Sequence, residues 1–149
     1  MILLVDDNAD DVTLTLWAFG KSGIRSEVIV ARDGIEALDL LLPTDGRAPL
    51  QPAIVLMDIN MPRMNGLETL QRLRGEPTTA TLPVIMLTSC LQDRDIVQSY
   101  DLGANSYIPK PIDSSEFLQA ATVLGVYWLA LNRRPALASA PRTSTGSFR

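Results

Sequence analysis

The sequence contains no histidine and only one cysteine, Cys90. Without imidazole groups the chain has no histidine metal ligand, general base or phosphohistidine, which excludes the catalytic triads that depend on histidine. One cysteine cannot form an internal disulfide, and this fits a reducing cytoplasm. Apolar runs are short: none reaches the roughly 18 residues of a membrane-spanning helix. Asp6 and Asp7 follow the first apolar residues at once, unlike a signal peptide, so we predict a cytoplasmic protein without a membrane segment.

Basic residues are scarce outside the C-terminal end of the chain. Four of the 13 Lys and Arg residues lie in residues 132–149, which contain none of the 17 acids. The acidic body argues against nucleic-acid binding, because phosphate contacts need a basic face. Residues 135–149 are rich in Ala, Ser, Thr, Pro and Arg, a composition typical of a mobile tail. We therefore predict one domain over residues 1–131 and a flexible basic tail over residues 132–149.

Short apolar runs alternate with helix-period patterns along the domain. The predicted strands cover residues 2–5, 28–31, 53–57, 82–87 and 106–108. The predicted helices cover residues 12–19, 35–42, about 67–73 and 93–102, with a last helix from Asp113. Residues 43–52 read as a surface loop. This alternation predicts an α/β fold with a parallel sheet and helices on both of its faces.

Three acids directly follow the first and third predicted strands: Asp6, Asp7 and Asp58. Ligands of an open α/β sheet gather at the carboxyl ends of the strands, so we expect these carboxylates to converge. Their mutual repulsion calls for a cation, and oxygen-only ligands favour Mg²⁺, with the backbone carbonyl of Asn60 as a fourth candidate ligand. Asp58 could then act as a nucleophile towards phosphorus and form an acyl phosphate. The plainer alternative for the Asp6-Asp7 pair is a solvated turn or helix cap.

Further polar residues follow the fourth and fifth predicted strands. The hydroxyl of Thr88 and the ammonium group of Lys110 could hold a phosphoryl group, and Ser89 would line the mouth of the site. Tyr107 is either a core residue or a rotamer switch that moves inward when Thr88 is drawn to the phosphate. Taken alone, Thr88 is as well explained by a structural role as by a functional one. The Lys110-Pro111 bond is a candidate cis peptide.

In this order, these residues resemble the receiver domain of two-component response regulators, over roughly residues 2–125. The resemblance is carried by the acidic pair, by the segment from Asp58 to Gly66, and by Thr88, Tyr107 and Lys110-Pro111. It implies a flavodoxin-like sheet in the order 2-1-3-4-5, Mg²⁺ dependence, and phosphotransfer from the histidine of a sensor kinase onto Asp58. It also implies a cis bond before Pro111 and signalling through the face of the fourth helix, fifth strand and fifth helix.

A narrower resemblance points to the small single-domain receivers that partner phytochrome-type histidine kinases. It rests on the segment from Ser99 to Ile108 and on Tyr127-Trp128. About 18 residues follow the last predicted helix, too few for a helix-turn-helix, so we expect a stand-alone regulator. It would signal by conformational change and protein binding and would have no independent enzymatic turnover. The runner-up within this class is a phosphate sink or relay for a phytochrome-type kinase.

Two other classes fit parts of the pattern. Phosphatases of the haloacid-dehalogenase type also use Asp, Thr or Ser, and Lys around Mg²⁺. That class places its nucleophile on the first strand and needs an acid two residues later, where this chain has Asn60. A flavin-binding protein of this fold needs a hydroxyl- and glycine-rich loop after the first strand, where Asp6 and Asp7 would repel the flavin phosphate.

The last predicted helix is apolar nearly all round from Ala120 to Leu131. A surface helix should be amphipathic, so an all-round apolar helix needs cover on every side. We predict a homodimer through this helix. The candidate interface residues are Val123, Val126, Tyr127, Trp128 and Leu131. The alternative is that residues 135–149 fold back over it.

Overall fold

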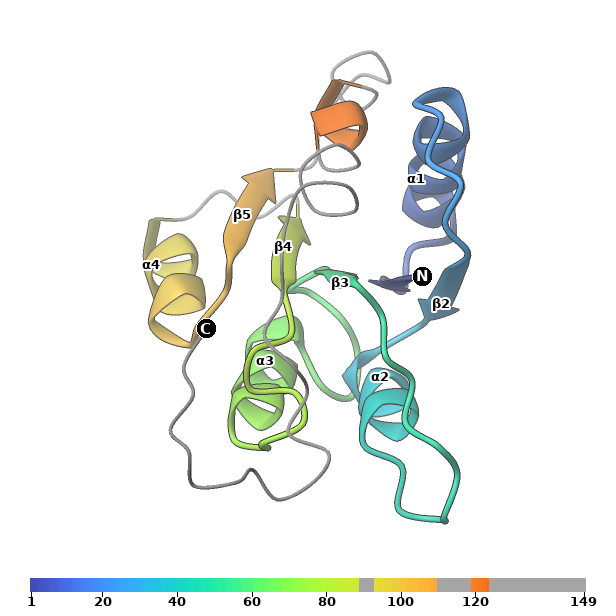
Figure 1. The fold of residues 1–149 in the computed structure, drawn as a ribbon. Coiled ribbons are helices and arrows are strands. Elements are labelled where there is room, and N and C mark those ends of the chain that lie inside the picture. Colours follow the sequence, from blue (N-terminus) through green and yellow to red (C-terminus); the bar gives the residue numbers. More distant parts are fainter. Residues whose placement is uncertain (89–92, 110–118, 124–149) are drawn as a thin grey trace, which may run out of the picture.

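The computed structural model describes residues 1–88, 93–109 and 119–123, and within them it contains one five-stranded parallel sheet (Figure 1). The strand order is β2-β1-β3-β4-β5, which confirms the order implied by the resemblance. The strands are β1 (Ile2–Val5), β2 (Val28–Ala31), β3 (Ile54–Met57), β4 (Val84–Thr88) and β5 (Ser106–Pro109). Each lies within two residues of its predicted range at either end, because a buried parallel strand is a continuous apolar run.

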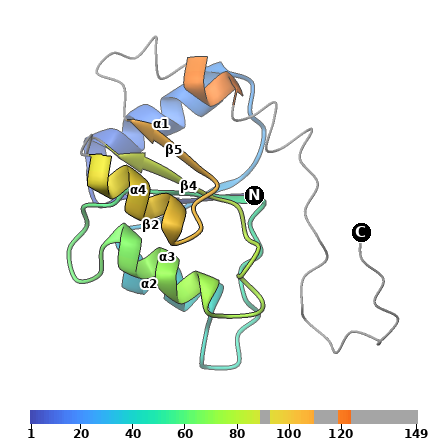
Figure 2. The same ribbon diagram turned by 90° about the vertical axis from the view of Figure 1, so that its left-hand side faces the viewer.

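Helices cover both faces of the sheet, as predicted. They are α1 (Ala9–Lys21), α2 (Gly34–Leu41), α3 (Gly66–Arg74) and α4 (Asp93–Asp101), and residues 119–123 are also helical. Figure 2 shows α1 and residues 119–123 on one side of the sheet, with α2 and α3 on the other. The predicted helix from Asp113 is confirmed for residues 119–123, and its other residues lie outside the described part of the chain.

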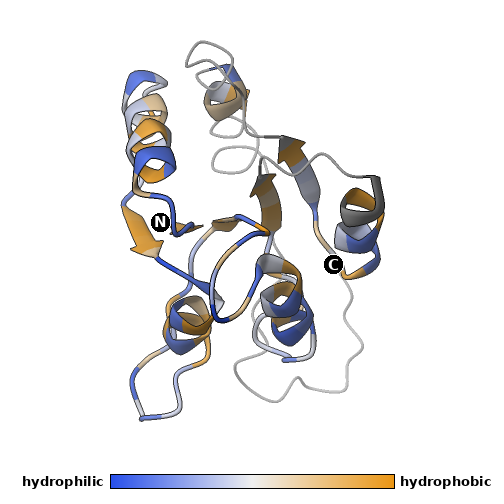
Figure 3. Ribbon diagram, turned by 180° about the vertical axis from the view of Figure 1, so that it is seen from behind, coloured by the Kyte–Doolittle hydropathy of each residue, from blue (hydrophilic) through white to orange (hydrophobic). Residues whose placement is uncertain are grey.

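The core consists of two layers, one on each face of the sheet. Along β1, Leu3 and Val5 pack towards α2 and α3, whereas Ile2 and Leu4 pack towards α1. All four side chains are almost fully buried. Figure 3 shows the resulting pattern, with hydrophobic residues along the strands and both hydrophobic and hydrophilic residues on each helix. Alternation of side chains across a strand explains why both faces need apolar residues.

Polar side chains cap the three helices that begin at the carboxyl ends of β1, β2 and β3. Asn8 accepts bonds from the N–H groups of Asp10 and Asp11 at the start of α1. Asp33 caps α2, and Asn65 forms a reciprocal capping box with the third residue of α3. Such caps satisfy N–H groups that have no partner within the helix. They also fix the backbone where the chain leaves the carboxyl edge of the sheet.

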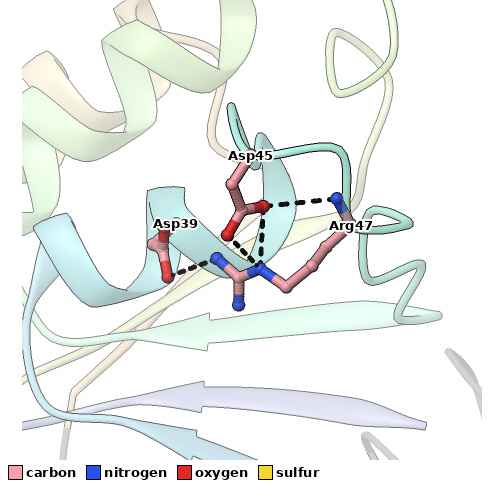
Figure 4. A network of polar contacts seen from close by, with 3 residues as sticks. All are labelled: Asp39, Asp45 and Arg47. Atoms are coloured by element: carbon pink, nitrogen blue, oxygen red, sulfur yellow. Dashed lines mark hydrogen bonds and ion pairs between the residues drawn. The ribbon is translucent and has the colours of Figure 1, made fainter.

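The loop between α2 and β3 carries an exposed ion-pair network at the opposite edge of the sheet (Figure 4). The guanidinium of Arg47 lies between Asp39 and Asp45, with N–O distances of 2.9 and 2.7 Å. Hydrogen bonding from the Arg47 side chain holds the pKa of Asp45 below its ordinary value. The prediction of a surface loop over residues 43–52 is confirmed, since most of these residues are exposed.

Arg74 ties the end of α3 to two loops at this same edge. Its guanidinium donates to the carbonyl oxygens of Gly103 and Thr79 and to the side chain of Asn105, at 2.7 to 3.0 Å. The Asn105 side chain also accepts a bond from the N–H of Val84 at the start of β4. One side chain thereby joins α3, the loop before β4 and the loop before β5.

Candidate functional site

Asp6 and Asp58 are neighbours because β1 and β3 are paired in register. Val5 lies opposite Met57, so the residues after them leave the sheet side by side. The N–H of Asp58 donates to the carbonyl of Val5, and the N–H of Asp6 donates to the carbonyl of Ala31, each at 3.0 Å. Two of the three acids are thus fixed by backbone hydrogen bonds at the carboxyl edge of the sheet.

The structure brings all three predicted acids together. Asp6, Asp7 and Asp58 each offer a carboxylate oxygen, and these oxygens lie within 4.8 Å of one another. Asp6 and Asp58 are buried, with 2% and 7% exposure, whereas Asp7 is exposed. Buried carboxylates that lie this close repel one another unless positive charge is supplied. The cluster therefore suits a hard divalent cation, which prefers oxygen ligands and retains several waters.

Backbone N–H groups hold the two buried carboxylates. Asp6 accepts a bond from the N–H of Asn8 at 3.0 Å, and Asp58 accepts one from the N–H of Asn60 at 3.3 Å. Asn60 is itself exposed, at the beginning of the loop that follows Asp58. This places the N–H of Asn60 beside Asp58, and the role of the Asn60 carbonyl as a further ligand stays a prediction.

Gly66 is required where α3 meets the backbone of Asp58. A Cβ atom on Gly66 would lie 2.2 Å from the carbonyl oxygen of Asp58, a distance that no side chain tolerates. The N–H of Gly66 also donates to the carbonyl of Ile59 at 2.8 Å. This close approach is the physical reason for a glycine at the end of the segment from Asp58 to Gly66.

Thr88 lies at the end of β4, the strand next to β3. Its backbone is described and pairs with Pro109, the last residue of β5. The Thr88 side chain is not among the described groups, and Ser89, Lys110 and Pro111 lie outside the described residues. The predictions for these side chains, and for a cis bond before Pro111, therefore stay predictions.

Tyr107 is half-buried and pairs with Met86 in the β4–β5 register. It packs against the core layer beneath α2 and α3, so its core contact is present in this structure. Its switch role stays a prediction. Of the predicted dimer residues, Val123 is described and is 68% exposed. Val126, Tyr127, Trp128 and Leu131 lie outside the described residues.

Sequence reasoning missed the contact between Asp33 and Arg63. The Nε of Arg63 donates to Oδ2 of Asp33 at 2.6 Å, and a second guanidinium nitrogen forms an ion pair with the same oxygen. Asp33 is 4% exposed. Burial raises the pKa of this carboxyl, but the N–H of Glu36 and the bond and charge of Arg63 together hold it below its ordinary value. The sequence signalled a helix start near Asp33-Gly34, but nothing in it linked Arg63 to that position.

Comparison with known proteins places this geometry in one family. The response regulator receiver domain family matches residues 2–122. The probable methanogenesis regulatory protein FilR2 of Methanothrix harundinacea is 33% identical, over 91% of this chain and 87% of that protein. The response regulator Rcp1 of Synechocystis is 29% identical, over 91% of this chain and 93% of that protein.

Solved structures agree with the sequence comparison. The phosphorylated cyanobacterial phytochrome response regulator RcpA has a TM-score of 0.80 and 32% identity, over 91% of this chain and 97% of that one. The Mn²⁺-bound form of response regulator Rcp1 has a TM-score of 0.81 and 29% identity, over 91% and 98% of the two chains.

The chain belongs to the response regulator receiver domain family. It has the flavodoxin-like fold of that family and is similar to the response regulator Rcp1 and to the cyanobacterial phytochrome response regulator RcpA, which supports a role in two-component signalling. Domains of this family are signalling modules, and a histidine kinase is the partner that membership implies. Within the described residues, no helix combines the length and the hydrophobicity needed to cross a bilayer.

Proposed function

We propose that this chain is a stand-alone response regulator that accepts a phosphoryl group from a sensor histidine kinase on Asp58. The observation that carries the proposal is the convergence of three carboxylates within 4.8 Å, two of them buried, at the carboxyl edge of β1 and β3. Asp58 directly follows β3, the central strand of five, which has β1 on one side and β4, ending in Thr88, on the other. A nucleophile there can be reached from both neighbouring strands.

The proposed reaction is a group transfer between two side chains. An oxygen of the Asp58 carboxylate attacks phosphorus, an O–P bond forms, and the P–N bond to the kinase histidine breaks, leaving its electron pair on that nitrogen. The product is an acyl phosphate on Asp58. A carboxylate oxygen carries no proton that must be removed before it attacks, so this step needs no general base.

Asp6, Asp7, Asp58 and the Asn60 carbonyl would hold Mg²⁺ in this proposal. The cation supplies charge neutralisation at the phosphoryl oxygens. The Mn²⁺-bound structure of Rcp1 supports a divalent-cation site, because Rcp1 is a relative with the same fold. The carboxylate-only cluster of this chain suits Mg²⁺, because Mg²⁺ prefers oxygen ligands and a small number of carboxylates.

Thr88, Ser89 and Lys110 are the proposed phosphoryl-binding residues. Thr88 ends β4, and Lys110 directly follows Pro109, the last residue of β5; both strands lie on the same side of β3. A hydroxyl can donate to a phosphoryl oxygen, and an ammonium group can pair with its charge. Tyr107, two residues before the end of β5, would report this binding by changing its rotamer.

The partners belong to the same proposal. The name of RcpA, a cyanobacterial phytochrome response regulator, supports a phytochrome-type kinase. We also infer a cytoplasmic homodimer that uses the last helix. The acidic character of residues 1–131 favours protein partners over nucleic acid. The domain would assist its own phosphorylation and dephosphorylation without independent turnover.

Intact-mass measurement after incubation with Mg²⁺ and a small acyl-phosphate donor tests this proposal. We expect one phosphoryl adduct on the parent chain that hydroxylamine removes, and none on Asp58→Asn. Asn keeps the size of the side chain and cannot form an acyl phosphate, so it is a matched control. A folded parent that binds Mg²⁺ but gains no adduct would contradict phosphorylation and favour an adaptor that signals without phosphate.

A further inference from the structure

The loop after Asp58 is tied to the start of α2 by a single arginine. The Arg63 side chain reaches across 30 residues of sequence to Asp33, with its Nε 2.6 Å from Oδ2. The side chain of Asp33 is 6% exposed, whereas that of Arg63 is 59% exposed. The acceptor of this contact is therefore buried, whereas more than half of the arginine side chain stays exposed. A charged hydrogen bond to a buried carboxylate is stronger than an exposed ion pair.

The two oxygens of Asp33 have separate partners. Oδ1 accepts the N–H of Glu36 and caps α2, at 2.9 Å. Oδ2 accepts Arg63. A helix cap needs only Oδ1, and asparagine caps as well as aspartate. The cap therefore does not need the negative charge of Asp33, whereas the ion pair with Arg63 does.

Backbone contacts bring the same two segments together. The N–H of Gly34 donates to the carbonyl of Met64 at 3.3 Å. A Cβ on Gly34 would lie 2.9 Å from that carbonyl oxygen and 1.9 Å from the hydroxyl of Thr69. The turn before α2 therefore packs directly on the loop, with no space for a side chain between them.

Arg63 also has an unusual backbone conformation. Its φ is 64°, and it is the only non-glycine residue with a positive φ among the described residues. The left-handed region is unfavourable for a residue with a Cβ, so surrounding contacts must stabilise it. The bond to Asp33 is such a contact, and it acts on the segment that joins Asn60 to α3.

We propose that the Asp33–Arg63 ion pair is a positioning contact for the cation site, which fixes the loop of residues 59–65 and hence the backbone of Asn60 beside Asp58. The inference rests on the proposed function, because it assumes that Asp6, Asp7, Asp58 and Asn60 bind Mg²⁺. Asp33 and Arg63 do not touch the reacting atoms. Their effect passes through the backbone between Arg63 and Asn60.

The test compares the Mg²⁺ affinities of the parent and of variants that lack the ion pair. Isothermal titration calorimetry and the chemical shifts of backbone amides in NMR spectra measure the affinity. Arg63→Asn removes the ion pair and tolerates a positive φ. Asp33→Asn keeps the helix cap and removes the charge. We expect each to weaken Mg²⁺ binding about tenfold, the lower end of the effect of removing a contact that orients a metal ligand. The double variant should be no weaker than either single variant, because both remove the same contact.

Arg47→Asn is the matched control. It removes an arginine that pairs with acids at the opposite edge of the sheet, and it should leave Mg²⁺ affinity unchanged. Arg63→Lys should recover part of the affinity, because it restores the charge without the planar fork. At saturating Mg²⁺, the phosphorylation rate of Arg63→Asn should return to that of the parent.

Several results would overturn the inference. Parental Mg²⁺ affinity in both single variants would show that the pair only stabilises the fold, even if their melting temperatures fall. Additive losses in the double variant would show that the two residues act separately. A parent that binds no Mg²⁺ would contradict this inference and the cation site together. A parent that binds Mg²⁺ but gains no phosphoryl adduct would contradict the proposed function alone, and the comparison of affinities would still decide this inference.

Discussion

At the scale of single residues, the site depends on glycine where the backbone is crowded. Gly66 stands against the carbonyl of Asp58, and a Cβ there would clash at 2.2 Å. A Cβ on Gly20, in the last turn of α1, would meet no atom within 4 Å apart from its chain neighbours and the backbone of its own helix. The same Gly→Ala change can be made at both positions. The difference between the two changes in stability then measures the effect of the close approach at Gly66.

Gly66→Ala should destabilise the fold by roughly 1–3 kcal/mol, because the new methyl group displaces Asp58 or α3. Gly20→Ala should instead stabilise it by about 0.5–1 kcal/mol, because alanine favours the helix. Urea denaturation followed by circular dichroism measures both. Equal effects of the two substitutions would contradict the close contact at Gly66.

The ionisation of Asp33 should make stability depend on pH. Its pKa in the folded chain lies below the ordinary value of 3.8, so the charged form stabilises the fold above that value. This contribution is lost as the pH falls through the lower, folded pKa. Between about pH 7 and about pH 3, the difference in free energy of unfolding between the parent and Asp33→Asn should therefore stay level until the pH approaches 3.8 and then shrink. A constant difference over this range would show that the charge contributes nothing.

At the scale of elements, local sequence predicted the strands and helices well. The runs Ile2–Val5 and Val28–Ala31 are strands with the predicted bounds, because a buried parallel strand has no polar interruption. Helix ends were less accurate: α2 begins at Gly34 where residue 35 was predicted, since the Asp33 cap lies one residue earlier. The three acids were predictable because each comes within two residues of the end of a strand.

Contacts between distant elements could not be predicted in the same way. Arg63 bonds Asp33, 30 residues away, and Arg74 bonds Gly103, 29 residues away. Surface arginines carry no periodic signal for such partners, because their long side chains reach acceptors that only the folded chain brings near. The acceptors at Gly103 and Thr79 are backbone carbonyls, which every residue possesses.

Arg74 provides a prediction at this scale. Arg74→Met keeps the aliphatic part of the side chain but leaves its acceptors at Gly103, Thr79 and Asn105 without this donor, which should cost about 1–3 kcal/mol. Arg72→Met is the control, since Arg72 lies in the same last turn of α3 and is exposed. Thermal or urea unfolding measures both variants. A loss as large in Arg72→Met would mean that the charge in the last turn, not the bonded network, stabilises the fold.

At the scale of the whole molecule, the prediction concerns self-association. Trp128→Glu and Val126→Glu place a charge in the proposed interface and should convert a dimer to a monomer, because an unpaired charge is costly in an apolar contact. Leu16→Glu on α1 replaces a leucine that is 41% exposed on another element, and it should leave the dimer intact. Sedimentation velocity over a range of concentrations distinguishes these states. A monomeric parent at high concentration would contradict the interface.

The central claim is that Asp58 becomes an acyl phosphate in a cation-dependent reaction at the three-acid cluster. Borohydride reduction after treatment with an acyl-phosphate donor converts a phosphorylated aspartate to homoserine, which peptide mass spectrometry then locates. We predict homoserine at position 58 when Mg²⁺ is present and none when it is chelated. Asp7→Asn should lower the yield, whereas Asp10→Asn, an exposed acid in the first turn of α1, should not. Homoserine at another position, or an equal yield without the cation, would contradict the claim.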